Sequence, residues 1–302
     1  MATPKILLLG SGGQLGLQLG GLLSALGSLT AWGRGDFQIS SSCLSESLDR
    51  LKPAVIVNAA AYTKVDAAES QPLEARLVNA VLPEILAHWA KKNSALLVHY
   101  STDYVFDGQN KAPYLETDSP NPLNVYGRTK LEGEKVISEI APRHLIFRTS
   151  WVFSVFGANF PKTILVLAAV RDTLVIKDDQ IGAPTSAELI ASVTALAVRA
   201  HLTTPDSPQG LYHLTASGAV TWYQYAQELM VRARRLGWPL PDGRPRLVPS
   251  YGPDPAKAAL RPLNSQLNTN KLLADWSVVL PDWTWYLDRF VFFLLNLKKF
   301  SL

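Results

Sequence analysis

Short apolar runs alternate with segments of helical period in the first half of the chain, and this alternation limits the possible folds more than any other feature. Five runs are typical of successive strands, at residues 5–10, 28–33, 54–61, 95–102 and 144–150. Amphipathic segments typical of crossover helices lie between them, at 14–26, 73–92 and 126–140. Strands that are apolar along their whole length suit a parallel sheet covered on both faces. We therefore predict an α/β protein with a doubly wound parallel sheet, whose ligands lie at the carboxyl ends of the strands.

The second half of the chain follows this pattern less closely, and we expect it to form a smaller C-terminal lobe. Strand candidates and helical segments alternate there at 174–179, 186–200, 210–215 and 221–236. The stretch 238–262 is rich in proline and should be mostly extended or turning. The expected division is a first domain at 1–150 and a lobe formed mainly by 151–302. Parts of 174–215 are candidates for returning to the first domain.

Composition excludes several classes of protein. The chain has 302 residues, of which 47% are hydrophobic and 18% charged, as in a folded protein with a large core. Cys43 is the only cysteine, so neither an internal disulfide nor a cysteine-based zinc or redox site can form. The five histidines show no metal-ligand spacing, and we expect no histidine metal site. The net charge of +4 comes from scattered lysines and arginines, which favours a small anionic substrate over nucleic acid.

The sequence carries no sign of a membrane or export segment. No apolar run reaches the roughly 18 residues that a membrane-spanning helix needs. The stretch that follows Met1 lacks the basic flank and cleavage site of a signal peptide. We therefore expect a cytoplasmic protein without a membrane partner.

A glycine-rich turn, "GSGGQLG", directly follows the first strand and directly precedes the first helix. Gly10 would permit the tight turn, Gly13 would let a pyrophosphate approach backbone N–H groups, and Gly16 would allow close helix packing. Glycine turns also occur for purely structural reasons. In this position the pattern favours a dinucleotide site and therefore a Rossmann-type fold.

The end of the second strand bears on the choice of dinucleotide. An Asp or Glu there would bind the ribose 2′-hydroxyl of NAD, but the chain reads "WGRGD", with Gly33 followed by Arg34. A guanidinium in place of a carboxylate favours the 2′-phosphate of NADP. Asp36 lies close enough to keep NADH as an alternative, and a solvated arginine in a loop is the simpler reading of Arg34.

Polar side chains at the end of the fourth strand and the start of the next helix could carry chemistry. Thr102 and Asp103 follow a buried strand, and Tyr126 and Lys130 lie one helical turn apart in "NVYGRTKLEGEK". An ammonium group near a phenol lowers the pKa of that phenol, so that it can exchange a proton with a substrate oxygen. Tyr126, Lys130 and Thr102 therefore form a candidate site for carbonyl reduction. The alternative is a solvated helix face without a catalytic role, and the glycine turn upstream argues against it.

The motifs together resemble those of the extended short-chain dehydrogenase/reductase family. They cover nearly the whole chain and read "GSGGQLG", "VIVNAAAYTKVDAAE", "STDYVFDG", "NVYGRTKLEGE", "FRTSWVF", "DQIGAPT", "GLYHLT" and "RPLNSQLNT". They are most similar to the branch that reduces the C4 keto group of dTDP-4-dehydro-β-L-rhamnose to give dTDP-β-L-rhamnose. The resemblance implies NADPH or NADH as cofactor, an NAD(P)-binding domain at 1–150 and a substrate-binding lobe mainly at 151–302.

The resemblance also implies a role for particular residues. Tyr126 would donate a proton to the C4 oxygen, with Thr102 assisting, and Lys130 would bond to the nicotinamide ribose. Further cofactor contacts would come from Gly13, Gln14, Leu15, Ala61, Tyr62, Thr63 and Tyr100. The nucleotide sugar would contact Thr102, Asp103 and Trp151, and Arg261 would pair with its diphosphate.

Two points stay open at this stage. Some family members dimerise through magnesium held by glutamates; Glu188 matches one such position, whereas Gln18 stands at another. The resemblance therefore leaves open whether magnesium binds and whether the protein is a monomer or a homodimer. Two other functions compete with the first: a reductase of another nucleotide-linked 4-keto sugar, and a catalytically silent, cofactor-binding regulatory subunit.

Overall fold

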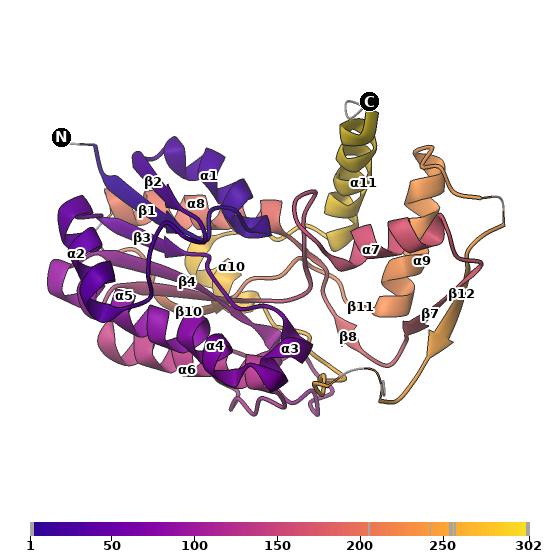
Figure 1. Ribbon diagram of the computed structural model, residues 1–302, viewed down its shortest axis with the longest axis horizontal. Helices are drawn as coiled ribbons and strands as arrows, with labels where there is room; N and C mark the ends of the chain where they lie inside the picture. Colours follow the sequence, from indigo (N-terminus) through magenta and orange to yellow (C-terminus); the bar gives the residue numbers. More distant parts are fainter. Residues whose placement is uncertain (1–2, 205, 242, 254–255, 257, 300–302) are drawn as a thin grey trace.

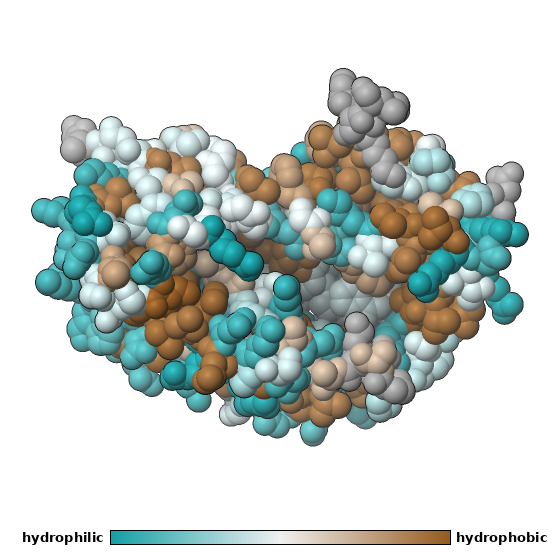
Figure 2. Space-filling model, viewed as in Figure 1, coloured by the Kyte–Doolittle hydropathy of each residue, from teal (hydrophilic) through white to brown (hydrophobic). Residues whose placement is uncertain are grey.

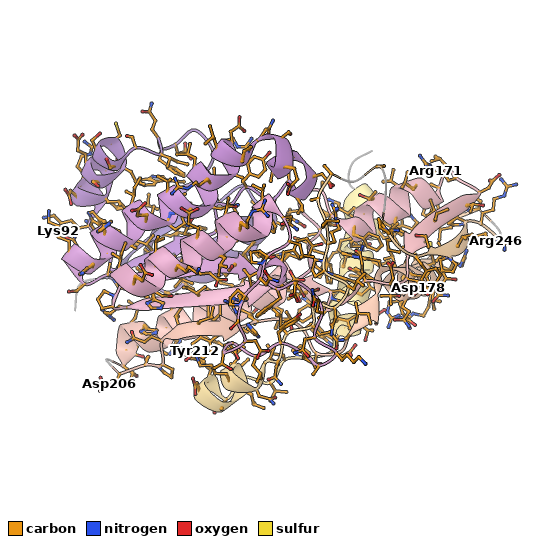
Figure 3. All side chains as sticks on the ribbon, turned by 90° about the horizontal axis from the view of Figure 1, so that it is seen from below. Lys92, Arg171, Asp178, Asp206, Tyr212 and Arg246 are labelled. Carbon is orange, nitrogen blue, oxygen red and sulfur yellow. The ribbon has the colours of Figure 1, made fainter. Side chains whose placement is uncertain are left out.

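A computed structural model describes residues 3–204, 206–241, 243–253, 256 and 258–299. A large α/β body occupies one end of the molecule and a smaller lobe the other (Figure 1). Lys92 lies toward the outer end of the large body, whereas Arg171 and Arg246 lie at the far end of the lobe (Figure 3). The surface is hollowed between the two parts (Figure 2).

The large body is built on a six-stranded parallel sheet in the order β10-β5-β4-β3-β1-β2. Its strands are β1 (Lys5–Leu9), β2 (Ser28–Trp32), β3 (Val55–Asn58), β4 (Leu96–Thr102), β5 (His144–Thr149) and β10 (Gly210–His213). The chain moves from β1 to β2 on one side and then returns to β3 on the other. This reversal opens a crevice between the carboxyl ends of β1 and β3, where ligands bind in such sheets. The predicted doubly wound parallel sheet is confirmed.

Helices cover both faces of this sheet (Figure 1). One face packs against α1 (Gln14–Ser24) and α8 (Ala187–Thr203), and the other against α2 (Ser41–Leu51), α5 (Leu82–Asn93) and α6 (Val125–Ile140). Side chains alternate along each strand, so Ile6 and Leu8 enter the first core, and Leu7 and Leu9 enter the second. Burial on both faces explains the nearly continuous apolar runs in the sequence.

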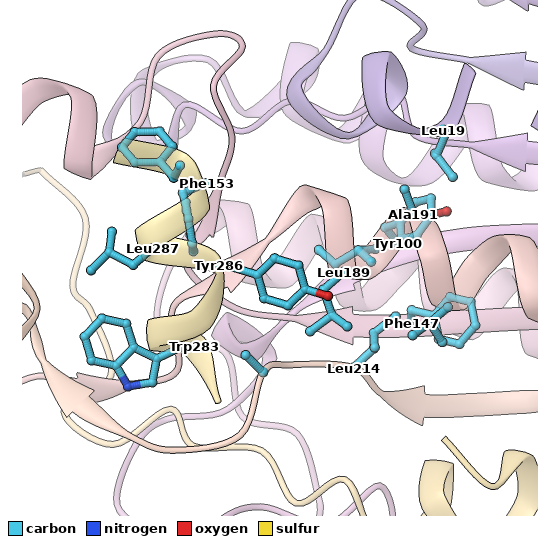
Figure 4. Packing of buried hydrophobic residues seen from close by; sticks show 14 of the residues in the cluster. Leu19, Tyr100, Phe147, Phe153, Leu189, Ala191, Leu214, Trp283, Tyr286 and Leu287 are labelled. Carbon is cyan, nitrogen blue, oxygen red and sulfur yellow. The ribbon is translucent and has the colours of Figure 1, made fainter. Parts of the chain in front are cut away.

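The smaller lobe holds pairs of short strands and three helices. Two pairs are parallel, β7 (Thr173–Lys177) with β12 (Arg246–Ser250) and β6 (Val152–Phe153) with β9 (Thr185–Ser186), and β8 (Ile181–Gly182) pairs antiparallel with β11 (Val220–Thr221). The helices are α7 (Phe160–Ala168), α9 (Trp222–Arg235) and α11 (Trp283–Lys299). Phe153, Trp283 and Leu287 join the apolar core that also holds Leu19 and Phe147 of the large body (Figure 4). One continuous core therefore links the two parts.

The remaining elements are short and lie near the hollow or at the back of the sheet. They are α3 (Val65–Ser70), α4 (Pro72–Arg76), a π-helical turn (Leu77–Val81), a 3-10 turn (Asp103–Val105) and α10 (Asn270–Trp276). No helix in the described part of the chain is both long and apolar enough to cross a membrane.

The structure differs from the sequence-based expectation in several elements. The π-helical turn interrupts the expected helix 73–92. The helices α2, α7 and α11 were not expected from the sequence. The proline-rich stretch includes the strand β12. Pro249 fits within β12 because this strand pairs only with β7, so it keeps one unpaired edge. Strand β10, from the stretch 174–215, pairs with β5 and so lies in the main sheet.

Candidate active site

The glycine turn after β1 leaves no space for larger residues at Gly10 and Gly16. Gly10 has φ +77°, and a Cβ there would lie 2.5 Å from the backbone nitrogen of Ala60. A Cβ on Gly16 would lie 2.1 Å from the carbonyl oxygen of Gly10. Gly13 is the N-cap of α1, so the helix begins directly beside the turn. Backbone N–H groups at the start of a helix therefore face the crevice between β1 and β3, where they suit a diphosphate.

A pocket of about 450 Å³ opens beside this turn. Of the residues predicted to bind a cofactor, Gly10, Gly13, Arg34, Ala61 and Tyr62 line it. Apolar side chains that sequence reasoning did not identify form much of its wall: Phe37, Ile39, Val78 and Leu82. An apolar pocket next to a diphosphate-binding turn suits a flat purine ring.

Other predicted cofactor residues lie outside the lining of this pocket. The Gln14 side chain reaches into the lobe, where its Oε1 accepts a hydrogen bond from Asn159 Nδ2 at 2.8 Å. Leu15 packs against the apolar core, and Thr63 is exposed. The Tyr100 ring is buried beside Leu189 and Ala191 of α8 (Figure 4), and its hydroxyl bonds to Thr194 at 2.8 Å. Alternation along β4 thus turns the Tyr100 ring into the core, and the expected cofactor contact of this residue stays a prediction.

The side chains of Asp36 and Arg34, which follow β2, have different surroundings. The Asp36 carboxylate accepts a hydrogen bond from the backbone N–H of Gly33 at 2.6 Å, which closes the turn. Arg34 lies between Gly33 and Asp36 in sequence and lines the pocket. A cationic group thus faces the pocket, while the nearby carboxylate is engaged by the backbone.

The π-helical turn holds one wall of the pocket in place through Asn79. The Asn79 side chain is buried, accepts a bond from the Tyr62 N–H at 2.8 Å and donates to the Tyr62 carbonyl at 3.1 Å. It also donates to Thr129 Oγ1 of α6 at 3.1 Å. Asn79 therefore links the cofactor pocket to the helix that carries Tyr126. In the sequence, Asn79 stood out only as a polar residue within an apolar helical stretch.

Tyr126 lies in the first turn of α6, beside the 3-10 turn that follows β4. Asn124 is the N-cap, and its side chain accepts a bond from Gly127 N–H at 2.8 Å. A Cβ on Gly127 would lie 2.2 Å from the carbonyl oxygen of Tyr104, so the helix start is pressed against the end of the 3-10 turn. The Tyr126 and Tyr104 rings meet edge to face, with centroids 6.0 Å apart. The sequence pattern at the start of α6 thus places Tyr126 next to the end of β4.

Burial controls the charge state of Tyr126. It raises the pKa of Tyr126 to about 12, and the hydrogen bond with Thr102 opposes this shift. The pKa is therefore not lowered as the spacing to Lys130 led us to expect, because burial would strip the phenolate of its hydration. Tyr126 is therefore protonated at neutral pH, as a proton donor must be.

Thr102 and Asp103 form a hydrogen-bonded pair at the end of β4. The Thr102 hydroxyl accepts from the Tyr104 N–H at 3.1 Å and donates to Asp103 Oδ1 at 3.0 Å. Burial raises the pKa of the Asp103 carboxyl to about 7, with hydrogen bonds from Ser265 and Thr102 opposing the shift. A carboxyl group that is half protonated near neutral pH is common at functional sites.

Lys130 lies one turn beyond Tyr126 and is almost completely buried, with 2% of its surface exposed. Its Nζ donates to the Tyr100 carbonyl and lies 3.2 Å from His99 Nε2. Burial lowers the pKa of Lys130 to about 8, while Glu134 opposes the shift. Of the two residues that hold Lys130, His99 was not identified from sequence, because it carries no motif of its own.

Trp151 is held by two neighbours from the smaller lobe. It follows β5 with φ +46°, a backbone conformation that is unfavourable for a bulky residue and recurs at functional sites. Its ring stacks on Trp222, with centroids 3.5 Å apart, and a Cβ on Gly182 would lie 2.5 Å from Trp151 Cε2. The predicted sugar-binding residue is thus a rigid, partly exposed aromatic platform.

Arg261 makes a different contact from the one expected. The prediction paired it with a substrate diphosphate, whereas its guanidinium forms a two-pronged ion pair with Asp66 of α3, at 2.7 and 3.1 Å. It also donates to the Ala259 carbonyl at 2.8 Å. This pair connects the proline-rich segment to the large body near Tyr104, whose pKa reflects both charges.

The residues at the candidate magnesium positions do not fit a metal. Glu188 forms an ion pair with Arg289 of α11 at 2.7 Å, and Gln18 carries no charge. No group of three or more His, Cys, Asp or Glu side chains in the described part of the chain could hold a metal ion. An arginine that neutralises the one remaining carboxylate removes the charge that Mg²⁺ requires.

Comparison with known proteins identifies the family. The family model of the RmlD substrate binding domain matches residues 4–294. The dTDP-4-dehydrorhamnose reductase of Escherichia coli K12 is 48% identical over 286 residues, which cover 92% of this chain and 94% of that protein. This chain belongs to the RmlD family. The extended reductase family expected from the motifs is confirmed.

Solved structures agree with this assignment. The dTDP-4-dehydrorhamnose reductase of Bacillus anthracis in complex with NADP has a TM-score of 0.86 and 29% identity, covering 96% of this chain and 99% of that chain. The enzyme of the same name from Clostridium acetobutylicum has a TM-score of 0.86 and 32% identity, covering 98% and 99%. The RmlD fold therefore extends over both the large body and the smaller lobe.

Proposed function

We propose that this protein reduces the C4 keto group of dTDP-4-dehydro-β-L-rhamnose with NADPH and so forms dTDP-β-L-rhamnose. The observation that carries the proposal is that Thr102 at the end of β4 bonds to Tyr126, while Lys130, one turn further along α6, bonds to the backbone of the same strand, in a chain of the RmlD family. Relatives that cover nearly the whole chain are named for this reaction, and one of them has been solved with NADP. The protein is therefore an oxidoreductase of nucleotide-sugar synthesis.

The chain contributes a proton donor and a hydrogen bond to this reaction. When bound, NADPH supplies the hydride that C4 receives. Tyr126 donates its phenolic proton to the C4 oxygen as negative charge develops there. The Thr102 hydroxyl, which donates to Asp103 in the protein alone, turns to the same oxygen and stabilises it. Lys130 restores the proton to Tyr126 and binds the nicotinamide ribose.

Preference for NADPH follows from Arg34. Its guanidinium lines the pocket next to Gly33, where the ribose 2′-phosphate would lie. The Asp36 carboxylate would bind a 2′-hydroxyl in an NADH enzyme, but it is already hydrogen-bonded to the turn. A phosphate gains a charge-assisted contact there, whereas a hydroxyl gains little.

The nucleotide sugar would bind in the hollow between the two parts of the molecule. Trp151, fixed on Trp222, offers a flat apolar surface to the hexose, and Asp103 offers an acceptor to its hydroxyls. We propose that Arg261 exchanges part of its contact with Asp66 for the diphosphate, which carries more negative charge. The substrate would therefore join the proline-rich segment to the catalytic end of β4.

The proposal also covers the metal requirement, the assembly and the location of the reductase. The ion pair between Glu188 and Arg289 takes the place of a metal ligand, so we propose that the reductase works without bridging magnesium. A monomer and a homodimer are both compatible with this. We place the reaction in the cytoplasm, with a nucleotide sugar and NADPH as its small-molecule partners.

Purified protein tests the function directly. It is incubated with dTDP-4-dehydro-β-L-rhamnose and either NADPH or NADH, and loss of reduced nicotinamide is followed by absorbance. We expect turnover with NADPH and slower turnover with NADH. Parallel reactions with GDP- and UDP-linked 4-keto sugars measure selectivity for the base. Absence of turnover with every sugar and both cofactors would contradict the proposal, and faster turnover of a GDP or UDP sugar would change its substrate.

A further inference from the structure

A buried row of polar side chains runs behind the catalytic lysine. Asn58 ends β3, His99 lies beside it on β4, and Lys130 reaches His99 from α6. Asn58 Nδ2 lies 3.1 Å from His99 Nδ1, and His99 Nε2 lies 3.2 Å from Lys130 Nζ. The exposed fractions of the three residues are 1%, 0% and 2%. Since buried polar groups are costly unless they are paired, each of these contacts restricts the others.

The orientation of the Asn58 amide determines which ring nitrogen of His99 carries the proton. Asn58 Oδ1 accepts a hydrogen bond from the Ala60 backbone N–H at 3.2 Å, so Nδ2 must point to His99. An N–H donor facing Nδ1 requires a lone pair on that nitrogen. Burial, together with Lys130, holds the pKa of His99 well below its usual range, so the ring is neutral. A neutral ring with a lone pair on Nδ1 carries its proton on Nε2, the atom that faces Lys130.

An Nε2–H group in this position favours the uncharged form of Lys130. An amine has a lone pair that accepts from His99 Nε2–H and an N–H that donates to the Tyr100 carbonyl. An ammonium group has no lone pair, so its N–H would meet the N–H of His99. The other ionisable groups near Lys130 are Tyr126, one turn earlier, and Glu134, one turn later. Glu134 favours the ammonium form, but its carboxylate is bound by Arg148 at 2.6 and 2.9 Å.

We propose that His99 is a positioning residue of the reductase reaction: as the Nε2–H tautomer held by Asn58, it fixes the Lys130 side chain and eases the loss of a proton from Lys130 to Tyr126. The proposal rests on the proposed function. In the cycle, the Tyr126 O–H bond breaks and its proton joins the C4 oxygen, which leaves a phenolate. One N–H bond of the Lys130 ammonium then breaks, its proton joins the phenolate, and the remaining lone pair accepts the His99 N–H. Lys130 takes a proton from water after product and cofactor leave.

Two substitutions separate this role from simple packing. In His99→Gln, the side-chain amide reaches toward Lys130 and can turn its carbonyl oxygen to the ammonium group, so the charged form gains a partner. We expect the decline of kcat at high pH to move upward by about one pH unit, because the proton is held more firmly. In His99→Asn, contact with Lys130 is lost, and we expect kcat to fall by about tenfold or more, with the Kd for NADPH changed less than about threefold.

His213→Gln is the matched control. His213 is also fully buried in the sheet, on β10, and its ring nitrogens face the Asn268 carbonyl at 3.1 Å and Arg148 at 3.5 Å. Among the described residues, the hydrogen bonds of Lys130 Nζ go to His99 and Tyr100 and not to His213, so the variant should lose stability while its pH profile stays in place. An equal shift of the profile in both glutamine variants, or no shift in His99→Gln, would overturn the proposal.

The tautomer can be read in the wild-type protein without substrate. ¹⁵N spectra of histidine-labelled protein distinguish a protonated from an unprotonated ring nitrogen, and the His99 signals are those that disappear in His99→Gln or, if that variant does not fold, in His99→Asn. A proton on Nε2 alone supports the proposal. A proton on Nδ1, or on both nitrogens at neutral pH, would overturn it. Failure of the proposed function would instead appear as missing sugar turnover in wild-type protein whose His99 has the expected tautomer.

Discussion

Replacing Tyr126 with phenylalanine is expected to remove most of the reductase activity and to leave the fold nearly intact. The ring keeps its edge-to-face contact with Tyr104 and loses only its hydroxyl. Thr102 stays satisfied, because its hydroxyl still accepts from the Tyr104 N–H at 3.1 Å and donates to Asp103 at 3.0 Å. The loss of one hydrogen bond without an orphaned partner costs about 1 kcal/mol of unfolding free energy.

The effect of the same substitution on the rate is much larger. Burial raises the pKa of Tyr126 to about 12, so the wild-type phenol is protonated over the neutral range and can donate. A positioned general acid contributes about 10² to 10⁴ in rate, or about 3 to 5 kcal/mol of activation free energy. We therefore expect kcat to fall by about 10³. The Kd for NADPH should change by less than about threefold, because phenylalanine retains the shape of the site.

The assay compares steady-state reduction with fluorescence titration of NADPH. Tyr225→Phe is the matched control, because this tyrosine is fully buried, its hydroxyl has no hydrogen-bond partner in the described part of the chain, and its ring contact with Trp222 does not need the hydroxyl. We expect that control to keep wild-type turnover and to be equally or more stable, since an unsatisfied hydroxyl is removed. Wild-type turnover in Tyr126→Phe, or equal losses of turnover and NADPH affinity, would refute the proton-donor role.

Three further substitutions test other parts of the structure. Arg34→Ala should weaken NADPH binding by about tenfold or more and leave NADH binding unchanged, as measured by calorimetric titration; equal losses for both would contradict the 2′-phosphate contact. Burial raises the pKa of Asp103 from 3.8 to about 7, so its protonated form is favoured in the folded state and stability should fall as pH rises between these values. Asp103→Asn should remove that fall in urea unfolding measured across this range, and an unchanged slope would argue against the raised pKa. Arg148→Met leaves the buried Glu134 carboxylate unpaired and should cost about 3 to 5 kcal/mol in urea unfolding, much of which Glu134→Gln in the same chain should restore.

Local signals in the sequence were sufficient to predict the sheet and to place the proposed catalytic residues near one another. Apolar runs predict strands because burial on both faces demands them, and the glycine turn predicts its own geometry because larger residues do not fit. Tyr126 and Lys130 share a face because helix geometry requires it. Thr102 could be placed near them because the carboxyl ends of parallel strands meet at one edge of the sheet.

Contacts between distant segments could not be predicted from local signals in the sequence. Arg261 pairs with Asp66, Trp151 stacks on Trp222, and neither pairing has a periodic signal in the sequence. Such partners are selected by how the whole chain packs, so an arginine expected at a diphosphate was found on a carboxylate.

The charge states at the site also depend on tertiary structure. The sequence alone determined that a tyrosine and a lysine stand one turn apart on a helix after a Rossmann-type sheet. Only the folded protein decided that both are buried, that burial raises the pKa of the tyrosine and lowers that of the lysine, and that His99 from β4 meets the lysine. The reason is physical: spacing along a helix is a local property, whereas hydration and hydrogen-bond partners are set by residues that folding brings from elsewhere.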